Sequence, residues 1–126
     1  MANETILVVD DNPINAKLAR IILEEAEFVV HVAGDAEQAL HLLQHCEPRL
    51  ILMDLKLPGV DGLTLTRALR EDARFQRTWI VALTAYAVKG DEARASAAGC
   101  DGYVTKPIDT DALAATVTSY LARERG

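Results

Sequence analysis

The sequence predicts an α/β fold in which helices cover both faces of a parallel β-sheet. Two observations lead to this prediction: short apolar runs recur along the chain, and each is followed by a stretch whose apolar residues repeat at helical spacing. Such alternation is typical of parallel sheets that are buried on both faces. At 126 residues, half of them apolar, the chain has the size of one domain, so we expect a single domain over residues 1–126.

The expected strands are five apolar runs separated by turn-forming residues. In chain order they cover Ile6–Val9, Phe28–Val32, Leu50–Met53, Trp79–Leu83 and the weaker Gly102–Val104. The chain stops soon after the last helical stretch, so we expect no attached output domain.

The helices expected between these strands are defined by apolar residues that share one helical face. In order, these sets are Ile14, Leu18, Ile21 and Ile22; Ala36, Leu40 and Leu43; Leu65 and Leu69; and Leu113, Val117 and Leu121. A further helix, with a weaker amphipathic pattern, is expected around Lys89–Ala98. Helix starts are indicated by Asn12 before Pro13, by Asp35 and by Asp109, since such residues cap free N–H groups.

Composition excludes several classes of function. Nineteen acidic against thirteen basic residues give a formal charge of -6, which argues against a broad electrostatic hold on nucleic acid or anionic lipid. The N-terminus lacks the pattern of a signal peptide, and no apolar run approaches the length that spans a bilayer. We therefore expect a cytoplasmic protein that binds neither nucleic acid nor a membrane.

The cysteines and histidines offer only weak candidates. Cys46 and Cys100 match neither a CxxC pair nor a zinc spacing, so we expect two reduced, mostly buried thiols. His41 and His45 lie four apart on an expected helix, near Cys46, and could form a face for a transition metal. That interpretation needs a third ligand that the sequence does not place, so a solvated helix surface is favoured.

Chemically active side chains follow four of the five expected strands. Asp10 and Asp11 end the first run, Asp54 the third and Thr84 the fourth, while Lys106 follows the fifth. In an open parallel sheet, ligands bind beyond the carboxyl ends of the strands, where the strand order reverses. We therefore expect three carboxylates, a hydroxyl and an ammonium group to collect at one edge.

Such a cluster of carboxylates needs a cation. Two like charges 4 Å apart repel by about 4 kcal/mol at an effective dielectric constant of 20. Lys106 can offset part of this cost, and Mg2+ suits a few oxygen ligands completed by water. With a metal and a lysine beside it, one aspartate could accept a phosphoryl group. Asp54 is the best candidate, because the turn at Pro58 and Gly59 leaves backbone amides free to meet phosphate oxygens.

Five motifs in order resemble the receiver domain of two-component response regulators. They are DD at 10 and 11, MD at 53 and 54, LPGVDG at 57 to 62, TA at 84 and 85, and KP at 106 and 107. Within this family, the sequence around the motifs is most similar in character to single-domain receivers of the DivK type and to receivers of hybrid kinases. This resemblance to the CheY-like superfamily covers nearly the whole chain and implies a flavodoxin-like, doubly wound (βα)5 fold with a central five-stranded parallel sheet.

The resemblance also implies a role for each site residue. Asp54 would take the phosphoryl group, and Asp11, Asp54 and the backbone carbonyl of Lys56 would bind Mg2+, with Asp10 acting through water or by orienting a ligand. Lys106, the Thr84 hydroxyl and the amides of Lys56 and Ala85 would contact the phosphoryl oxygens. The resemblance further implies that Lys106-Pro107 is a cis peptide. It also implies that Tyr103 moves inward as Thr84 shifts.

The expected function is that of a receiver without its own output domain. It would take phosphate from a phosphohistidine on a sensor histidine kinase or a histidine phosphotransfer protein. It would then contact a downstream target through the fourth helix, fifth strand and fifth helix, as a monomer or a phosphorylation-dependent dimer. We expect no enzymatic activity beyond phosphotransfer and autodephosphorylation.

Two other classes of function were weighed against this one. A Mg2+-dependent aspartyl-phosphate phosphatase acting on a small substrate is disfavoured, because the first carboxylates are adjacent rather than spaced as DxD and no cap insertion is present. A flavodoxin-like cofactor binder is disfavoured because DDNPIN, at residues 10 to 15, presents negative charge to any phosphate.

Overall fold

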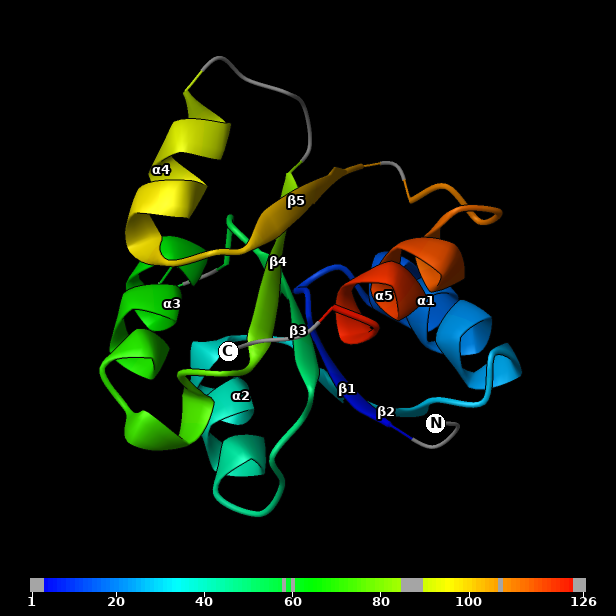
Figure 1. Ribbon diagram of the computed structural model, residues 1–126, viewed down its shortest axis with the longest axis horizontal. Coiled ribbons are helices and arrows are strands. Elements are labelled where there is room, and N and C mark those ends of the chain that lie inside the picture. The colour runs from blue at the N-terminus through cyan, green and yellow to red at the C-terminus, as the bar shows by residue number, and fades with distance from the viewer. Residues whose placement is uncertain (1–3, 58, 60, 85–89, 107, 124–126) are drawn as a thin grey trace.

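The computed structural model is a five-stranded parallel sheet flanked by helices on both faces (Figure 1). It describes residues 4–57, 59, 61–84, 90–106 and 108–123. The strands are β1 (Thr5–Val9), β2 (Val29–Ala33), β3 (Leu50–Asp54), β4 (Trp79–Thr84) and β5 (Gly102–Thr105). The helices are α1 (Pro13–Glu25), α2 (Ala36–Leu43), α3 (Gly62–Arg70), the short 3-10 helix η1 (Ala73–Phe75), α4 (Asp91–Ala98) and α5 (Leu113–Leu121).

The strands are ordered β2-β1-β3-β4-β5, which confirms the predicted doubly wound fold. The order reverses between β1 and β3, so the carboxyl ends of these two strands flank the crevice where ligands bind in such sheets. The pairing register of β1 and β3 determines which residues meet at this crevice. Val9 of β1 pairs with Met53 of β3, and the next residue on each strand is Asp10 and Asp54, respectively.

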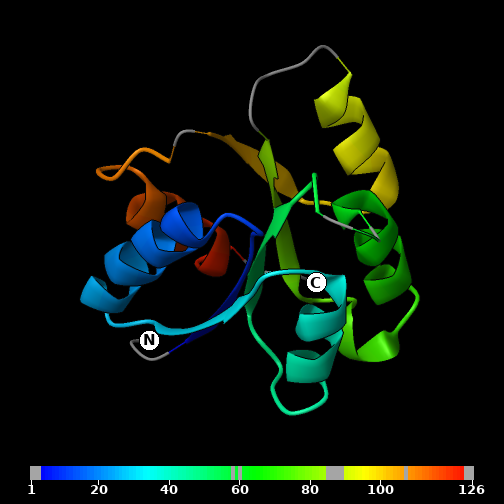
Figure 2. The same ribbon diagram turned by 180° about the vertical axis from the view of Figure 1, so that it is seen from behind.

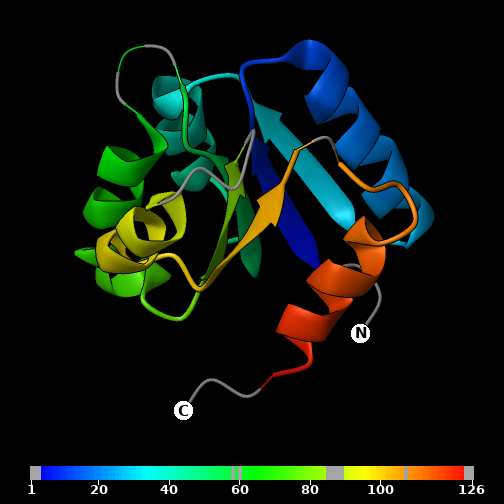
Figure 3. The ribbon, with the colours of Figure 1, turned by 90° about the horizontal axis from the view of Figure 1, so that it is seen from above.

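The sheet separates two apolar cores. α1 and α5 lie on one side, and α2, α3 and α4 lie on the other (Figure 3). Neighbouring strand residues point to opposite faces, so Ile6 and Val8 join the core under α1 and α5, whereas Leu7 and Val9 join the core under α2 and α3. Seen from behind, β2 forms one edge of the sheet and contacts both α1 and α2 (Figure 2). This packing fixes the strand ends that carry the polar residues.

Two of the three predicted helix starts are confirmed. The Asn12 side chain accepts hydrogen bonds from the N–H groups of Ile14 (2.9 Å) and Asn15 (3.3 Å), and Pro13 opens α1. The Asp35 side chain likewise caps α2. The expectation for Asp109 is wrong: its carboxylate accepts the N–H of Asp111 (2.9 Å) and closes a turn, and α5 begins only after Ala112. A short acidic side chain can accept the backbone N–H two residues later and close a turn as readily as it caps the end of a helix.

The cysteines agree with the expectation. Both thiols are free, and Cys46 and Cys100 are mostly, though not fully, buried. Burial raises the pKa of both thiols, which keeps them protonated and poorly nucleophilic. Within the described residues, no helix has the length and apolar character needed to cross a membrane.

Candidate functional site

The structure brings the predicted strand-end residues together at one edge of the sheet. A carboxylate oxygen of each of Asp10, Asp11 and Asp54 lies within 4.8 Å of the others. A cavity of about 470 Å³ opens beside them and is lined, among others, by Asp54, Thr84 and Lys106. The grouping that the motif order predicted is therefore confirmed in space.

Lys106 is the cation of this cluster. Its Nζ lies 2.8 Å from Asp54 Oδ2 and 3.3 Å from Asp10 Oδ2, and its side chain is only 16% exposed. Burial alone would lower the pKa of the ammonium, but the hydrogen bond to Asp54 and the charges of both carboxylates outweigh it, so the pKa of Lys106 is raised. Lys106 is thus a fixed positive charge in the site.

The two adjacent carboxylates have different surroundings. Asp10 is 2% exposed and accepts the N–H of Asn12 (2.9 Å), whereas Asp11 is exposed and lines the cavity. Desolvation raises the pKa of Asp10, and this effect outweighs the hydrogen bond from Asn12 and the charge of Lys106, which both lower it. The buried member is therefore short of positive charge, and the exposed member is accessible to solutes.

Two buried polar atoms lack a hydrogen-bond partner. Across the described ranges, these are Asp10 Oδ2 and Thr84 Oγ1, and no other buried side-chain oxygen or nitrogen shares this condition. Buried polar groups in native proteins are nearly always hydrogen-bonded. Asp10 Oδ2 retains its 3.3 Å ion pair with Lys106 but no hydrogen bond. Both atoms belong to the strand-end cluster, so this site can receive a ligand that contacts oxygen atoms.

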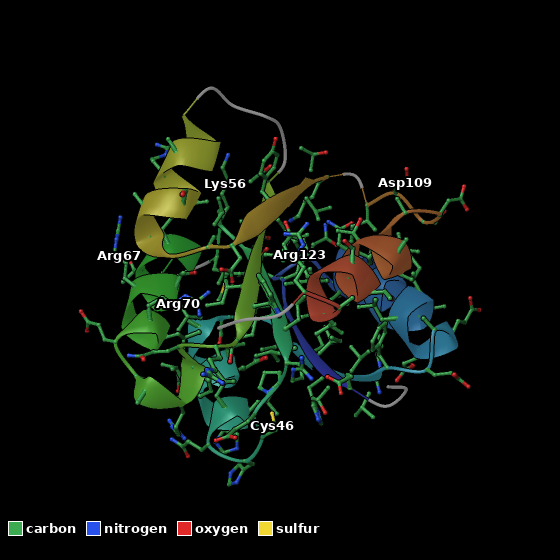
Figure 4. The ribbon with its side chains drawn as sticks, in the orientation of Figure 1. Cys46, Lys56, Arg67, Arg70, Asp109 and Arg123 are labelled. Atoms are coloured by element: carbon green, nitrogen blue, oxygen red, sulfur yellow. The ribbon has the colours of Figure 1, made fainter. Side chains whose placement is uncertain are left out.

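Asp54 is fixed by contacts on both carboxylate oxygens. Oδ1 accepts the backbone N–H of Lys56 (3.0 Å), and Oδ2 accepts from Lys106. Lys56 follows β3 at the carboxyl edge of the sheet (Figure 4), and its side chain is exposed. The Lys56 N–H therefore contacts the Asp54 carboxylate itself, while its contact with a phosphoryl oxygen and its carbonyl as a metal ligand stay predictions.

Sequence reasoning missed the close packing of α3 against the site. A Cβ added to Gly62 would overlap the carbonyl oxygen of Asp54, so only glycine lets α3 start this close to the strand end. The side chain of Asp61 caps this helix by accepting the N–H of Thr64 (2.8 Å). The pair Asp-Gly before a helical stretch could have signalled this start.

The remaining predicted residues are placed as follows. Tyr103 lies on β5 and is 40% exposed, and its inward movement stays a prediction. Ala85 and Pro107 fall outside the described residues, and with them the Ala85 amide contact and the cis peptide. The rings of His41 and His45 touch edge to face at 5.3 Å. In the described part of the chain, the aspartates alone form a cluster of three or more possible metal ligands.

The donor set fits Mg2+. This hard cation takes oxygen ligands and retains several waters, so one or two carboxylates beside a solvent-filled cavity suffice. Asp11 faces the cavity, and Oδ2 of Asp10, which lacks a hydrogen bond, can orient a water or a ligating group. The nitrogen and sulfur ligands that favour zinc or copper are absent from this cluster.

Comparison with known proteins identifies the family. The family model for the response regulator receiver domain matches residues 6–118. The chain belongs to the response regulator receiver family. The resemblance that the five motifs predicted is therefore confirmed, and membership implies a place in two-component signalling, with kinases or phosphotransfer proteins and downstream targets as interaction partners.

Individual relatives agree with this receiver assignment. The polar-differentiation response regulator DivK of Brucella ovis is 37% identical over 118 residues, covering 94% of this chain and 96% of DivK. A two-component response regulator from Clostridium difficile has a TM-score of 0.89 at 26% identity, covering 96% and 98% of the two chains. A receiver domain of a histidine kinase from Syntrophus aciditrophicus has a TM-score of 0.86 at 28% identity, covering 98% and 96%.

Proposed function

We propose that this receiver takes a phosphoryl group onto Asp54 from a phosphohistidine, in the presence of Mg2+, and signals through contacts that depend on phosphorylation. One observation carries the proposal: the two buried side-chain atoms of the described residues that lack a hydrogen bond, Asp10 Oδ2 and Thr84 Oγ1, belong to the same strand-end cluster as Asp54. A phosphoryl oxygen would accept a hydrogen bond from the Thr84 hydroxyl, and the accompanying metal ion or one of its waters would contact Asp10 Oδ2.

The transfer step follows from the surroundings of Asp54. A carboxylate oxygen of Asp54 attacks phosphorus, the bond between phosphorus and the histidine nitrogen breaks, and that nitrogen keeps the electron pair and takes up a proton. The Lys106 ammonium and the Lys56 N–H already contact the Asp54 carboxylate. They therefore lie beside the oxygen atoms to which the phosphoryl group would attach, where they would stabilise its negative charge.

Asp10, Asp11, Asp54 and the carbonyl of Lys56 would bind the metal ion. When bound, Mg2+ neutralises carboxylate charge and stabilises the negative oxygens of the phosphoryl group. The cluster favours this ion because three carboxylates face a single ammonium group.

The signal would begin at Thr84. Its buried hydroxyl has no partner among the described residues, so donation to a phosphoryl oxygen gives it a first hydrogen bond and favours a shifted position. Thr84 ends β4 and pairs with Thr105 of β5, which lies two residues after Tyr103 on that strand. The face of α4, β5 and α5 would thereby present two surfaces of different affinity to its partners.

The proposed chemistry is limited to the receiver's own phosphoryl group. Without a further substrate site at Asp54, the chain would act as a signalling protein rather than an enzyme, limited to phosphotransfer and hydrolysis of its own acyl phosphate. The phosphodonor would be a histidine kinase or a phosphotransfer protein. The receiver would work in the cytoplasm, as a monomer or a phosphorylation-dependent dimer.

Incubation with acetyl phosphate, followed by intact mass measurement, tests this function. With Mg2+ we expect the mass of one phosphoryl group to be added, and with a chelator we expect none. The variant Asp54→Asn should remain unlabelled, because an amide oxygen is a poor nucleophile. The matched control Asp111→Asn, in the exposed turn before α5, should be labelled like the wild type. Labelling of Asp54→Asn at the wild-type rate would refute the proposal.

A further inference from the structure

A second cavity lies at the opposite, amino-terminal edge of the sheet. It has a volume of about 680 Å³, and three separate segments line it: residues 47–49 before β3, residues 74–79 around the start of β4, and residues 121–123 at the end of α5. Asp54 sits at the far end of β3, so the whole length of the strand separates this cavity from the phosphoryl site. Its size is in the range of small-molecule sites.

Arginine dominates the lining of this cavity. Four of the nine arginines of the chain, Arg49, Arg74, Arg77 and Arg123, line it together, in a protein whose formal charge is -6. Glu47 is the acidic residue of the lining. Among the described residues, no lysine lines the cavity. The difference matters because a guanidinium group, unlike an ammonium group, can bind two phosphate oxygens at once.

Two of these guanidinium groups have no carboxylate partner within the described part of the chain. Arg49 pairs with Glu4 at 2.6 Å, and Arg74 pairs with Asp72 at 2.9 Å. Arg77 and Arg123 form no ion pair with any residue in 4–57, 59, 61–84, 90–106 or 108–123. The cavity therefore has two positive charges available to an anion.

The walls around these two arginines are fixed. The Arg123 guanidinium lies 4.4 Å above the Tyr120 ring, which in turn packs on Trp79 at 5.5 Å. On the other wall, Arg70 donates to the carbonyl oxygens of Phe75 and Thr78, both at 2.8 Å, and so clamps the segment that carries Arg77. A site whose backbone and one charged group are already ordered loses less entropy on binding.

We propose that this cavity, defined by Arg49, Arg74, Arg77 and Arg123, binds a diphosphate group, free or as part of a nucleotide-sized molecule. Each of two linked phosphates can accept one free guanidinium, Arg77 or Arg123, through paired hydrogen bonds. The volume leaves room for an organic group beyond the diphosphate. The volume, which is in the range of small-molecule sites, favours a small molecule over an acidic segment of a protein.

Trp79 provides a direct readout, because it is the only tryptophan of the chain and lines the cavity. Titration of the full chain with inorganic pyrophosphate, in a chelator to remove Mg2+, should change its fluorescence in a saturable way. Arg77→Gln and Arg123→Gln should each weaken binding by at least about tenfold, since each removes a charge-assisted pair of hydrogen bonds. Arg67→Gln is the matched control, because Arg67 projects outward from α3 (Figure 4) and should leave the affinity unchanged.

A calorimetric titration with adenosine diphosphate separates the two sources of the diphosphate. Tighter binding than pyrophosphate would assign the site to a nucleotide, and equal binding would assign it to the diphosphate alone. No saturable binding at millimolar concentration would overturn the proposal, as would an equal loss in Arg67→Gln. Binding of an aspartate-rich peptide without binding of pyrophosphate would also overturn it and assign the cavity to a protein partner.

Discussion

At the scale of single residues, the site depends on the unequal burial of Asp10 and Asp11. Asp10 is buried and shares Lys106 with Asp54, while Asp11 is exposed at the cavity. Burial of a carboxylate is unfavourable unless positive charge compensates it. The metal-free protein therefore carries a destabilising charge, and that charge becomes useful when a cation binds.

Asp10→Asn should stabilise the metal-free protein. The substitution removes the buried charge and its repulsion of Asp54, so we expect the free energy of unfolding to rise by about 1 kcal/mol, the usual scale of a single substitution. Urea denaturation in a chelator measures this change. With saturating Mg2+ the order should reverse, because the variant binds the ion more weakly. A variant less stable than the wild type under chelation would contradict the account of Asp10.

Lys106→Met should have the opposite effect in the metal-free protein. Loss of the ammonium leaves the carboxylates of Asp10 and Asp54 without their shared cation, and we expect a loss of about 2 kcal/mol by urea denaturation. Lys17→Met on the exposed surface of α1 is the matched control and should change stability little. Equal stability of Lys106→Met and the wild type would show that the ion pairs contribute nothing.

At the scale of elements, the start of α3 connects the fold to the site. Asp61 caps the helix, and Gly62 allows the helix to lie against the backbone of Asp54. The position of the proposed phosphoacceptor thus depends on a helix start as well as on β3.

The Asp61 cap makes a pH-dependent contribution to stability. The hydrogen bond from the Thr64 N–H lowers the pKa of Asp61 below its ordinary 3.8, so the contribution is full above that value and is lost as pH falls through the lowered pKa. Asp61→Ala should cost about 1 kcal/mol near neutral pH, a modest value for an exposed cap. The cost should shrink below about pH 4 in urea denaturation, and Asp61→Asn, which retains the cap, should restore most of it. A cost independent of pH would refute this explanation.

Gly62→Ala should displace the first turn of α3. The added Cβ would overlap the Asp54 carbonyl oxygen, and overpacking of this kind costs about 1 to 3 kcal/mol. Thermal unfolding should show a lower midpoint, and labelling by acetyl phosphate should slow. The control Gly34→Ala meets only the flexible end of Gln38 and should change both quantities less. Unchanged stability in Gly62→Ala would contradict the packing described here.

At the scale of the whole molecule, the sequence predicted the architecture and the grouping of the strand-end residues for a physical reason. Five apolar runs with helical stretches between them determine a parallel sheet, and such a sheet collects its strand ends at one edge. Asp10, Asp54 and Lys106 could thus be placed together although they lie far apart in the chain. The turn at Asp109 could not be predicted, because a local hydrogen bond competes with a helix cap there.

Contacts between distant segments lay beyond the sequence pattern. Arg70 on α3 pairs with Asp101, 31 residues away, at 2.7 Å, and no periodicity or motif signals that pair. The arginine cavity at the amino-terminal edge has the same origin, because its three segments meet only after the sheet has formed.

Mg2+ should stabilise the whole domain through these strand-end carboxylates. A ligand that binds only the folded state adds stability that grows with the logarithm of its concentration relative to its dissociation constant, about 2.7 kcal/mol at a hundredfold excess. Thermal unfolding of the wild type should therefore shift upward with MgCl2. The shift should fall strongly in Asp11→Asn and persist in Asp111→Asn. An equal shift in Asp11→Asn would exclude Asp11 as a ligand.

The central claim is that Asp54 is the residue that carries the phosphoryl group. Reduction of the phosphorylated protein with borohydride converts an aspartyl phosphate to homoserine, and peptide mass spectrometry then locates it. The account predicts homoserine in place of Asp54 and unchanged Asp10 and Asp11, in a reaction that requires Mg2+. Homoserine at Asp10 or Asp11, or phosphate retained on a hydroxyl such as Thr84, would contradict it.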